Sequence, residues 1–312
     1  MNDWNLKTPI AFIIFRRADN TERVFEAIRQ AKPPKLLVVA DGPRADRPGE
    51  AEKCAATRAI IDSVDWECEV IKNYSDVNMG MKQREVSGFN WIFGLVEEAI
   101  ILEDDCLPHM TFFRFCEELL EYYRHDTRIM TISGDNSPLG YRRTEDSYYF
   151  SHFSRTWGWA TWRRAWEYYD VEMKKWPQVR DNNWLKDVLQ DDKAVKRWTY
   201  LLQSTYEGYD KKWDTWDYQW TLASWMQNGL TIIPNVNLIT NLGFGAEGTL
   251  TKDAGNPRDN LPVQALTFPL KHPPFMIRDT QADAFTQRNV YDVPSLFMRA
   301  KLKAIKILKN AQ

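Results

Sequence analysis

The sequence predicts an α/β protein with a mostly parallel central sheet flanked by helices. Short apolar runs alternate with helical patterns through the first half of the chain, which is the order expected of parallel strands joined by crossover helices. The run at residues 99–102 is apolar throughout, as in a strand that is buried on both faces of a sheet. We therefore expect one large sheet with helices packed against it.

The expected elements follow from periodicity and turn residues. Strands are expected at residues 10–15, 35–40, 68–73, 99–102, 129–133 and 148–150. Helices are expected at residues 21–31, 50–63, 82–93, 111–123, 194–207 and 216–228. Asp19 and Glu22 are spaced as a capping box for the first helix. Segment 241–260, rich in Gly, Asn and Asp, is expected to be a long loop that acts as a lid.

The composition is that of an ordinary globular protein. The chain has 312 residues, of which 44% are hydrophobic and 27% charged, and no linker-like segment divides it. We therefore expect a single domain over residues 1–294, followed by a tail at 295–312. Lys and Arg total 41 against 43 for Asp and Glu, so the charge balance provides no basic surface for nucleic acid.

The sequence also predicts a cytoplasmic protein. Its four cysteines lack metal-ligand spacing and are too few for a disulfide scaffold. The start, MNDWNLKTPIAFIIF, lacks the basic region of a signal peptide, and no apolar run approaches the roughly 20 residues of a membrane span. The tail is basic and amphipathic, which suits either the anionic inner face of a membrane or a terminal helix docked on the domain.

Tryptophan is concentrated in one part of the chain. Eleven of the 14 tryptophans lie between Trp157 and Trp225. Such a concentration either fills a thick core or forms apolar platforms with a polar edge, which suit the flat faces of sugar rings.

Three consecutive acids follow the apolar run at 99–102. Glu103, Asp104 and Asp105 would repel one another at the end of a buried strand, and a divalent cation would relieve that repulsion. Mg²⁺ and Mn²⁺ take carboxylate oxygens and share their remaining positions with substrate phosphates. The triplet therefore predicts a metal-diphosphate site with Asp105 as metal ligand and Glu103 and Asp104 in support. The alternative is a solvated acidic cluster.

The segment IILEDDCLPHMTFFRFCEELLEYYRHDTRIMTISGDN resembles bacterial nucleotide-diphospho-sugar transferases, which are glycosyltransferases of the GT-A type. It is more distantly similar to the Golgi α-mannoside β-1,2-N-acetylglucosaminyltransferase, which has the same acid triplet followed by Pro and paired Phe residues. The resemblance continues through GWATWRRAW and WDYQW to IIPNVNLITNLGFG, about residues 9–248. It implies a GT-A fold with a nucleotide-binding half at about 1–136 and an acceptor half at about 137–294.

By position, the resemblance also implies the residues that bind the donor nucleotide. These are Arg16, Arg17, Asp41, Asn78, Gly80 and Arg84, together with Glu103 and Asp104. Arginine offers a forked donor to phosphate, and Asp accepts from a ribose hydroxyl or a base N–H. Arg16 as a surface residue and Asp41 as a turn former are the structural alternatives.

Glycosyl transfer with inversion requires a base that takes the proton of the acceptor hydroxyl. Asp214 and Asp217 lie three apart at the start of an expected helix in KKWDTWDYQW and could share one face. Asp217 is the expected base and Asp214 the reserve. Their alternative roles are an N-cap and a favourable charge at the helix N-terminus.

The donor or acceptor sugar is expected to meet a different set of residues. Asp135 and Asn136 end an expected strand, while Trp157 and Trp159 offer indole faces on either side of the small Gly158.

These expectations combine into a metal-dependent, inverting transferase that uses Mn²⁺ or Mg²⁺. Its partners would be a nucleotide-sugar donor, with UDP favoured, and a glycan or lipid-linked acceptor hydroxyl. The alternatives are a nucleotidyltransferase on the same metal site and a non-catalytic glycan-binding relative. FRRADNTERV lacks the Gly-rich phosphate loop of the nucleotidyltransferases, which argues against the first.

Overall fold

The computed structural model describes residues 4–136, 144–208, 214–244 and 261–292. The strands within these ranges are β1 (Ile10–Ile14), β2 (Lys35–Ala40), β3 (Glu69–Tyr74), β4 (Glu98–Glu103), β5 (Cys106–Pro108), β6 (Ile129–Ser133), β7 (Tyr148–Ser151), β8 (Trp159–Trp162), β9 (Leu230–Pro234) and β10 (Ile239–Asn241). The α-helices are α1 (Ala18–Ala31), α2 (Glu50–Ile60), α3 (Met81–Leu95), α4 (Thr111–Tyr122), α5 (Arg163–Trp166), α6 (Trp176–Asp181), α7 (Leu185–Leu189), α8 (Asp192–Tyr206), α9 (Asp217–Met226) and α10 (Thr280–Thr286). A 3₁₀ turn, η1 (Ile61–Ser63), and a π-helical turn, η3 (Gln287–Tyr291), follow α2 and α10.

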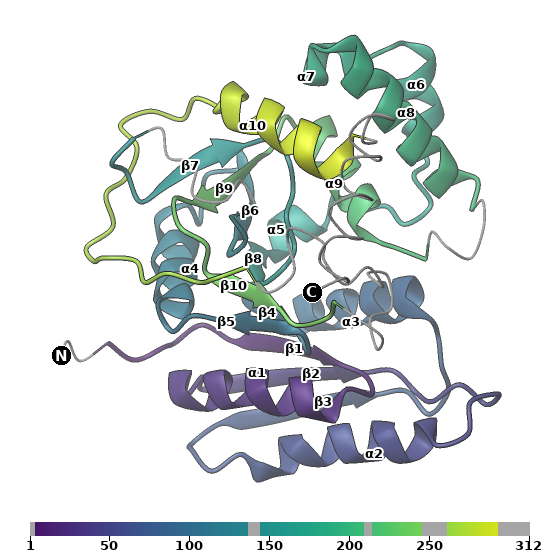
Figure 1. Ribbon diagram of the computed structural model, residues 1–312, viewed down its shortest axis with the longest axis vertical. Helices are drawn as coiled ribbons and strands as arrows, with labels where there is room; N and C mark the ends of the chain where they lie inside the picture. The colour runs from purple at the N-terminus through teal and green to yellow at the C-terminus, as the bar shows by residue number, and fades with distance from the viewer. Residues whose placement is uncertain (1–3, 137–143, 209–213, 245–260, 293–312) are drawn as a thin grey trace, which may run out of the picture.

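An eight-stranded sheet with the order β3-β2-β1-β4-β8-β6-β9-β7 forms the centre of the molecule (Figure 1). Strands β3, β2, β1 and β4 are parallel, and so are β6 and β9. Strand β8 runs antiparallel to both of its neighbours, and β7 runs antiparallel to β9. Six of these eight strands therefore share one direction, which confirms the predicted mostly parallel sheet.

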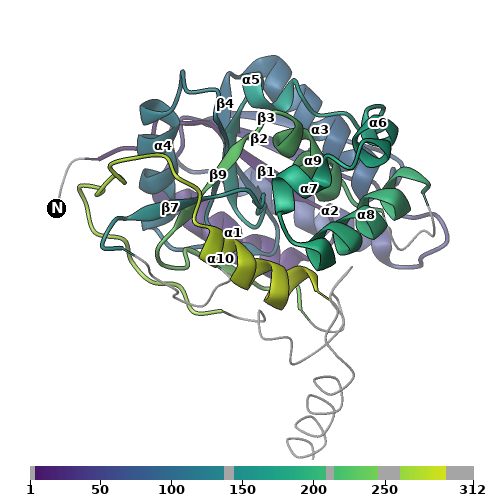
Figure 2. The same ribbon diagram turned by 90° about the horizontal axis from the view of Figure 1, so that it is seen from above.

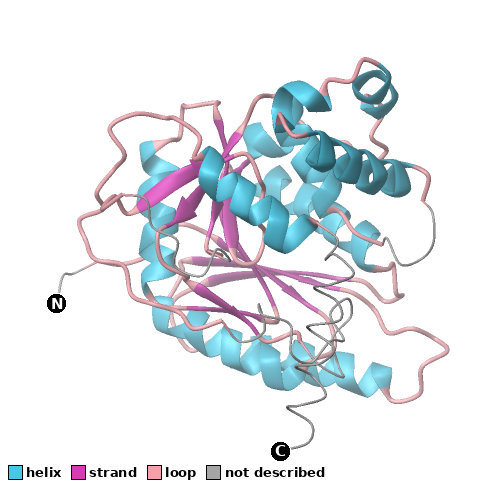
Figure 3. Ribbon diagram, turned by 45° about the horizontal axis from the view of Figure 1, so that its top comes forward, coloured by secondary structure: helices cyan, strands magenta, loops and turns pink. Residues whose placement is uncertain are grey.

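Helices cover both faces of this sheet (Figures 2 and 3), which confirms the predicted α/β class. On one face, helices α1 and α4 pack against Ile10 and Phe12 of β1. On the other face, helices α3, α5 and α9 pack against Ala11 and Ile13 of the same strand. Burial on both faces explains why the strand sequences are apolar without alternation. Helices α6, α7 and α8 form a third apolar cluster with α9.

Most of the concentrated tryptophans are core residues. Trp159, Trp176, Trp198 and Trp220 are fully buried, and Trp159 stacks on Trp216 with ring centroids 5.4 Å apart. The tryptophans therefore mainly build the packing of the second face and of the α6–α8 cluster, as the core-filling alternative predicted.

The predicted capping box is wrong. Helix α1 begins at Ala18, and the Thr21 amide donates to the Arg17 carbonyl oxygen over 2.9 Å. Asp19 and Glu22 therefore lie inside the helix, which has no side-chain cap at Arg17. Asp19 instead falls in the first turn, where its charge is favourable to the helix dipole.

Parts of the predicted organisation fall outside the described residues. These are the tail at 295–312 and segment 245–260 of the expected lid. Within the described ranges, none of the helices combines the length and the apolar character that crossing a bilayer requires. All four cysteines are described, and none forms a disulfide bond.

Two short strands that the sequence patterns did not predict lie beside the central sheet. Strand β10 pairs antiparallel with β5, so that Asn241 lies opposite Cys106.

Gly158, which precedes β8, packs directly against β10. It has a φ of +56°, and a Cβ there would lie 2.3 Å from Ile239 Cδ1. Only glycine satisfies both the backbone conformation and the close approach.

We predict that Gly158→Ala lowers the free energy of unfolding by about 2–4 kcal/mol, the sum of backbone strain and overpacking. Gly49→Ala is the matched control, because Gly49 has a φ of +79° but open space around its Cα. It should cost about 1 kcal/mol, from strain alone. Urea unfolding of both variants measures the difference, and equal losses would contradict the close packing at Ile239.

Candidate functional site

A cleft of about 960 Å³ opens along the edge of the sheet where β1, β2 and β4 end. Because β8 runs in the opposite direction, the residues that precede it reach the same edge as the residues that follow β6. In the order of the strands, the cleft is lined by Asp41, Arg16, Arg17, Glu103, Asp104, Asp105, Trp157 and Asp135. Ligands of open α/β sheets gather at this edge.

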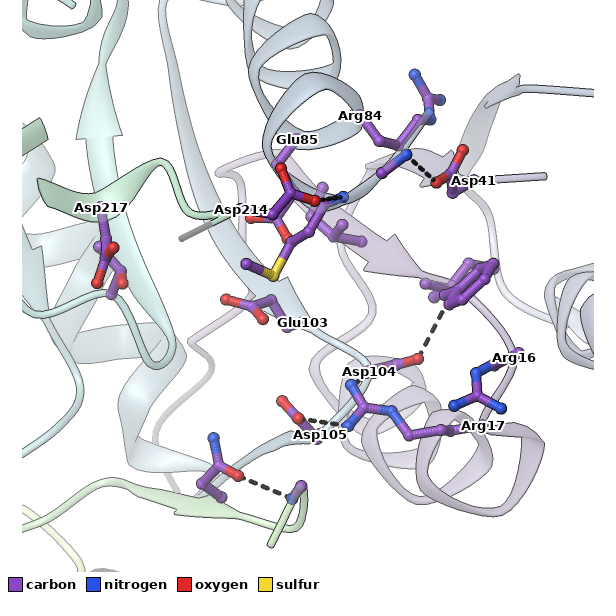
Figure 4. A pocket seen from close by; sticks show the side chains of 18 of the residues that line it. Arg16, Arg17, Asp41, Arg84, Glu85, Glu103, Asp104, Asp105, Asp214 and Asp217 are labelled. Carbon is purple, nitrogen blue, oxygen red and sulfur yellow. Dashed lines mark hydrogen bonds and ion pairs between the residues drawn. The ribbon is translucent and has the colours of Figure 1, made fainter. Parts of the chain in front are cut away.

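Arg17 lies against the acid triplet (Figure 4). Its guanidinium forms an ion pair with Asp105 at 2.8 Å and a second, shorter one with Asp104. Burial opposes the charge of Arg17, but the two carboxylates outweigh this effect and raise its pKa. Burial also raises the pKa of Asp104, to about 6, although Arg17 opposes the shift. Arg17 therefore neutralises only part of the triplet.

Glu103 faces a second group of carboxyls. Burial and the nearby charge of Asp105 raise the pKa of Glu103 to about 8. Glu85, the fifth residue of α3, is buried, and its pKa is raised well above the usual range by burial and by Glu103. Its Oε2 has no hydrogen-bond partner among the described residues. This part of the cleft thus holds more carboxyl groups than its surroundings can keep ionised.

Asp41 organises the turn that contains Asn78 and Gly80. Its carboxylate accepts from the amides of Met79 at 2.9 Å and Gly80 at 3.2 Å, and from Asn78 Nδ2 at 2.9 Å. All three predicted residues line the cleft together. The contacts of Asp41 in this structure are those of a turn former, which was the structural alternative.

The two other predicted arginines differ in setting. Arg84 is buried and donates to the Ala40 carbonyl oxygen at 3.1 Å and to Asn73 Oδ1 at 2.9 Å, which ties together the ends of β2 and β3. Arg16 lies 3.4 Å from Glu50 and keeps part of its side chain exposed to the cleft. Arg16 is therefore better placed than Arg84 to meet an anionic ligand.

Asp214 and Asp217 lie across the cleft from Arg16 and Arg17 (Figure 4). Asp214 accepts from the amides of Met81 at 2.9 Å and Lys82 at 3.3 Å, so it caps helix α3, which is far away in the sequence. Asp217 begins α9 and accepts from the Thr215 hydroxyl. Burial raises the pKa of Asp217, and the Thr215 bond opposes the shift.

The expected sugar-binding residues divide into two groups. Asp135 and Trp157 line the cleft, with Gly158 next to them. Asn136 is fully buried and donates from Nδ2 to the Pro234 carbonyl oxygen at 2.7 Å, while Trp159 belongs to the core of the second face. Neither of these two lines the cleft in the described part of the chain.

Sequence reasoning missed several residues that line the cleft. They are Glu85, Arg155 and the cations Arg44, Arg47 and Lys53. Glu85 follows Arg84 in an ordinary helical pattern, and the three cations lie in or near the start of α2. No local signal distinguished them, because only the tertiary structure brings them to the triplet. Arg155 could have been noticed as a charge within an otherwise aromatic stretch.

The carboxylates of the cleft are suitable ligands for a divalent cation. Among the described residues, no three His, Cys, Asp or Glu side chains are arranged as a group that could hold a metal by themselves. Mg²⁺ and Mn²⁺, however, commonly use one or two carboxylates and complete their coordination with substrate phosphates and water. The hard oxygens of the triplet and the excess negative charge near Glu103 and Glu85 fit such a partial site.

Comparisons with known proteins assign no function. No protein family and no curated protein matches the chain. Similar solved structures include a mannosyltransferase from Pyrobaculum calidifontis in complex with GDP-Man and Mn²⁺, with 14% identity and a TM-score of 0.37 over 53% of this chain and 47% of that one. This chain thus matches about half of the mannosyltransferase.

Two nucleotide-using enzymes are similar at the same level. One is 4-diphosphocytidyl-2C-methyl-D-erythritol synthase from Anaerococcus prevotii, with 9% identity and a TM-score of 0.31 over 51% of this chain and 72% of that one. The other is apo UDP-glucose pyrophosphorylase, with 9% identity and a TM-score of 0.35 over 72% and 90%. Because all three TM-scores are below 0.5, the function proposed below rests on the site itself.

The raised pKa of Glu103 predicts a stability that depends on pH. The unfolded chain releases this proton near the ordinary value of 4.5, whereas the folded protein retains it up to about 8. Folding stability is therefore lost as pH rises between these values. Glu103→Gln, which cannot ionise, should gain stability relative to the parent protein between about pH 5 and about pH 8, as measured by urea unfolding in EDTA.

Glu52→Gln on α2 is the control, because this side chain is exposed. Its stability difference from the parent protein should change little over the same pH range. The prediction fails if the two variants behave alike.

Proposed function

We propose that the protein is a metal-dependent, inverting glycosyltransferase of the GT-A type. It transfers a hexosyl or N-acetylhexosaminyl group from a nucleotide-diphosphate sugar, with UDP favoured, to a hydroxyl of a surface glycan or lipid-linked precursor. The observation that supports this most is the juxtaposition of carboxylates and cationic side chains in one cleft at the carboxyl ends of parallel strands. The tail at 295–312 would keep the enzyme on the inner face of the membrane.

The carboxylates suit the metal ion of a metal-bound diphosphate, and the cationic side chains suit its phosphates. Asp105, supported by Glu103 and Asp104, would hold Mn²⁺ or Mg²⁺, and the metal would neutralise the departing diphosphate. The surrounding cations supply donors for phosphate oxygens; they are Arg16, Arg17, Arg44, Arg47 and Lys53. Asp41 and the Asn78–Gly80 turn would meet the nucleoside beyond them.

Asp217 is the proposed catalytic base. Its carboxyl lines the cleft, and its raised pKa brings proton uptake closer to neutral pH, where a general base is most effective. Asp214 already accepts two amide hydrogen bonds from α3, which gives it a structural task. The two acids that the sequence left as alternatives therefore take separate roles in this proposal.

The connection between β1 and α1 favours glycosyl transfer over nucleotidyl transfer. Only Phe15, Arg16 and Arg17 separate the two elements, and none is a glycine. A loop that wraps phosphates with successive backbone amides requires glycines and more length. Here phosphate recognition would depend on side chains instead.

The first experiment measures nucleotide binding. UDP, GDP, CMP and dTDP are titrated calorimetrically into the protein with and without Mn²⁺. We expect one diphosphate to bind only with Mn²⁺, and Asp105→Asn to weaken that binding at least about tenfold, because a coordinating carboxylate is lost. Asp62→Asn, which alters an exposed carboxylate of η1, serves as the control and should bind like the parent protein.

Absence of binding by every diphosphate would overturn the proposal. Formation of a nucleotide sugar from a nucleoside triphosphate and a sugar 1-phosphate would assign the site to nucleotidyl transfer instead. Binding of glycans without any nucleotide would point to the non-catalytic relative.

The roles of the two aspartates give a further prediction. Asp217→Asn should reduce kcat for sugar transfer about 10²–10⁴-fold while the affinity for the diphosphate stays unchanged, because only proton removal is lost. Asp214→Asn should mainly lower stability, by about 1 kcal/mol, as expected for a weakened helix cap. Steady-state kinetics and urea unfolding of both variants test this. A larger kinetic loss in Asp214→Asn would reverse the assignment.

A further inference from the structure

An ion pair between Asp135 and Arg155 lies in the wall of the cleft, away from the acid triplet. Asp135 follows β6, and Arg155 lies between β7 and β8. Asp135 Oδ2 accepts from Arg155 Nε at 2.9 Å, and the two residues are only 4% and 6% exposed. Burying two charges is costly for folding, so such a pair is seldom explained by stability alone.

Arg155 has bonding capacity that the described protein does not use. Its Nη2 is buried and has no hydrogen-bond partner among the residues that the structure describes. Buried donors of this kind are rare, and each one calls for an explanation. Arg155 lines the cleft, so a bound molecule can approach it from there.

The strand register places this pair about as far from the triplet as the sugar of a bound nucleotide sugar would reach. Ile101 of β4 and Ser133 of β6 both pair with Trp159 of β8. Ile101 and Ser133 are therefore level and two strand spacings apart, about 10 Å, and Glu103 and Asp135 each lie two residues beyond these positions. A sugar joined to a diphosphate at the triplet would extend across the start of β8 toward β6, with Trp157 between the two sites.

We propose that the Asp135–Arg155 pair recognises the hydroxyl groups of a neutral hexose and discriminates against hexuronic acids. This inference rests on the proposed function and specifies its donor. A sugar hydroxyl both donates and accepts, a carboxylate only accepts and a guanidinium only donates. The pair therefore matches one hydroxyl, or two adjacent ones, in both roles.

A carboxylate on the sugar does not fit the same place. It can accept from Arg155 Nη2, but it then lies against the charge of Asp135. Two carboxylates brought together in a partly buried site repel each other, which disfavours binding of the acidic sugar.

The test uses calorimetric titration in Mn²⁺ with UDP, UDP-glucose, UDP-galactose and UDP-glucuronic acid. If GDP is the diphosphate bound, GDP-mannose and GDP-mannuronic acid replace them. The parent protein should bind a neutral nucleotide sugar at least about tenfold more tightly than the acidic one. Asp135→Asn should reduce the ratio between the affinities for the neutral and the acidic nucleotide sugar, and it should leave the affinity for the free diphosphate unchanged.

Two further variants separate recognition from structure. Arg155→Lys keeps the charge beside Asp135 but lacks the forked guanidinium. It should therefore weaken the binding of neutral nucleotide sugars about tenfold and leave the affinity for the free diphosphate unchanged. This variant decides the question if Asp135→Asn does not fold. Asp126→Asn breaks the pair of a partly exposed Asp126 with the exposed Arg128, outside the cleft lining, and is the matched control.

Two results would overturn the inference while leaving the proposed function intact. In the first, the diphosphate binds but the acidic nucleotide sugar binds as tightly as the neutral ones. In the second, the ratio is the same in Asp135→Asn and the parent protein. Failure of every diphosphate to bind is a different result, because it removes the proposed function and this inference together.

Discussion

The site depends on the repulsion between carboxyl groups that the fold collects at the end of β4. Glu103 and Asp105 are close enough to Glu85 to raise its pKa, and Arg17 forms ion pairs with Asp104 and Asp105 of the triplet. The pKa of Glu103, raised to about 8, shows that the compensation is incomplete. Ionising all of these carboxyls therefore costs free energy, and a further positive charge would offset that cost.

Several neighbouring features hold the triplet in place despite this repulsion. The Phe15 amide donates to Asp104 at 3.2 Å, and the Leu242 amide donates to the Asp105 carbonyl oxygen at 2.7 Å. At Gly243, a Cβ would lie 2.1 Å from Asp105 Oδ2, so the chain leaving β10 packs directly against this carboxylate. The acids are thus fixed from β1 on one side and from β10 on the other.

The sequence predicted the parallel half of the fold well, because strands buried on both faces give unbroken apolar runs and the crossover helices give clear periodicity. It also predicted the acid triplet at the end of a strand. It did not predict β5, β8, β9 or β10, which have three to five residues and little pattern of their own. Strand β8 lies in an aromatic stretch, where tryptophans that pack in the core obscure the sequence pattern of a strand.

The rest of the site could not be predicted because its contacts are distant in the chain. Asp214 caps a helix that begins more than 130 residues earlier, and no local pattern can show this. Glu85 and Arg155 reach the cleft only through the packing of α3 and the reversed direction of β8. Asn136 was expected in the site because it follows a strand end, but its side-chain amide instead donates to the Pro234 carbonyl oxygen.

The reversed strand β8 divides the cleft between two stretches of sequence. The residues from Phe15 to Asp105 reach the edge through β1, β2, β4, α3 and the start of α2, whereas Asp135, Arg155 and Trp157 reach it through β6 and the segment before β8. The two groups are joined mainly by the sheet. In evolutionary terms the enzyme proposed here is modular. Changes around β6 and β8 can alter which sugar is accepted without rebuilding the part that would hold the nucleotide. Related chains can therefore diverge in the donor sugar while the architecture of the first 105 residues stays the same.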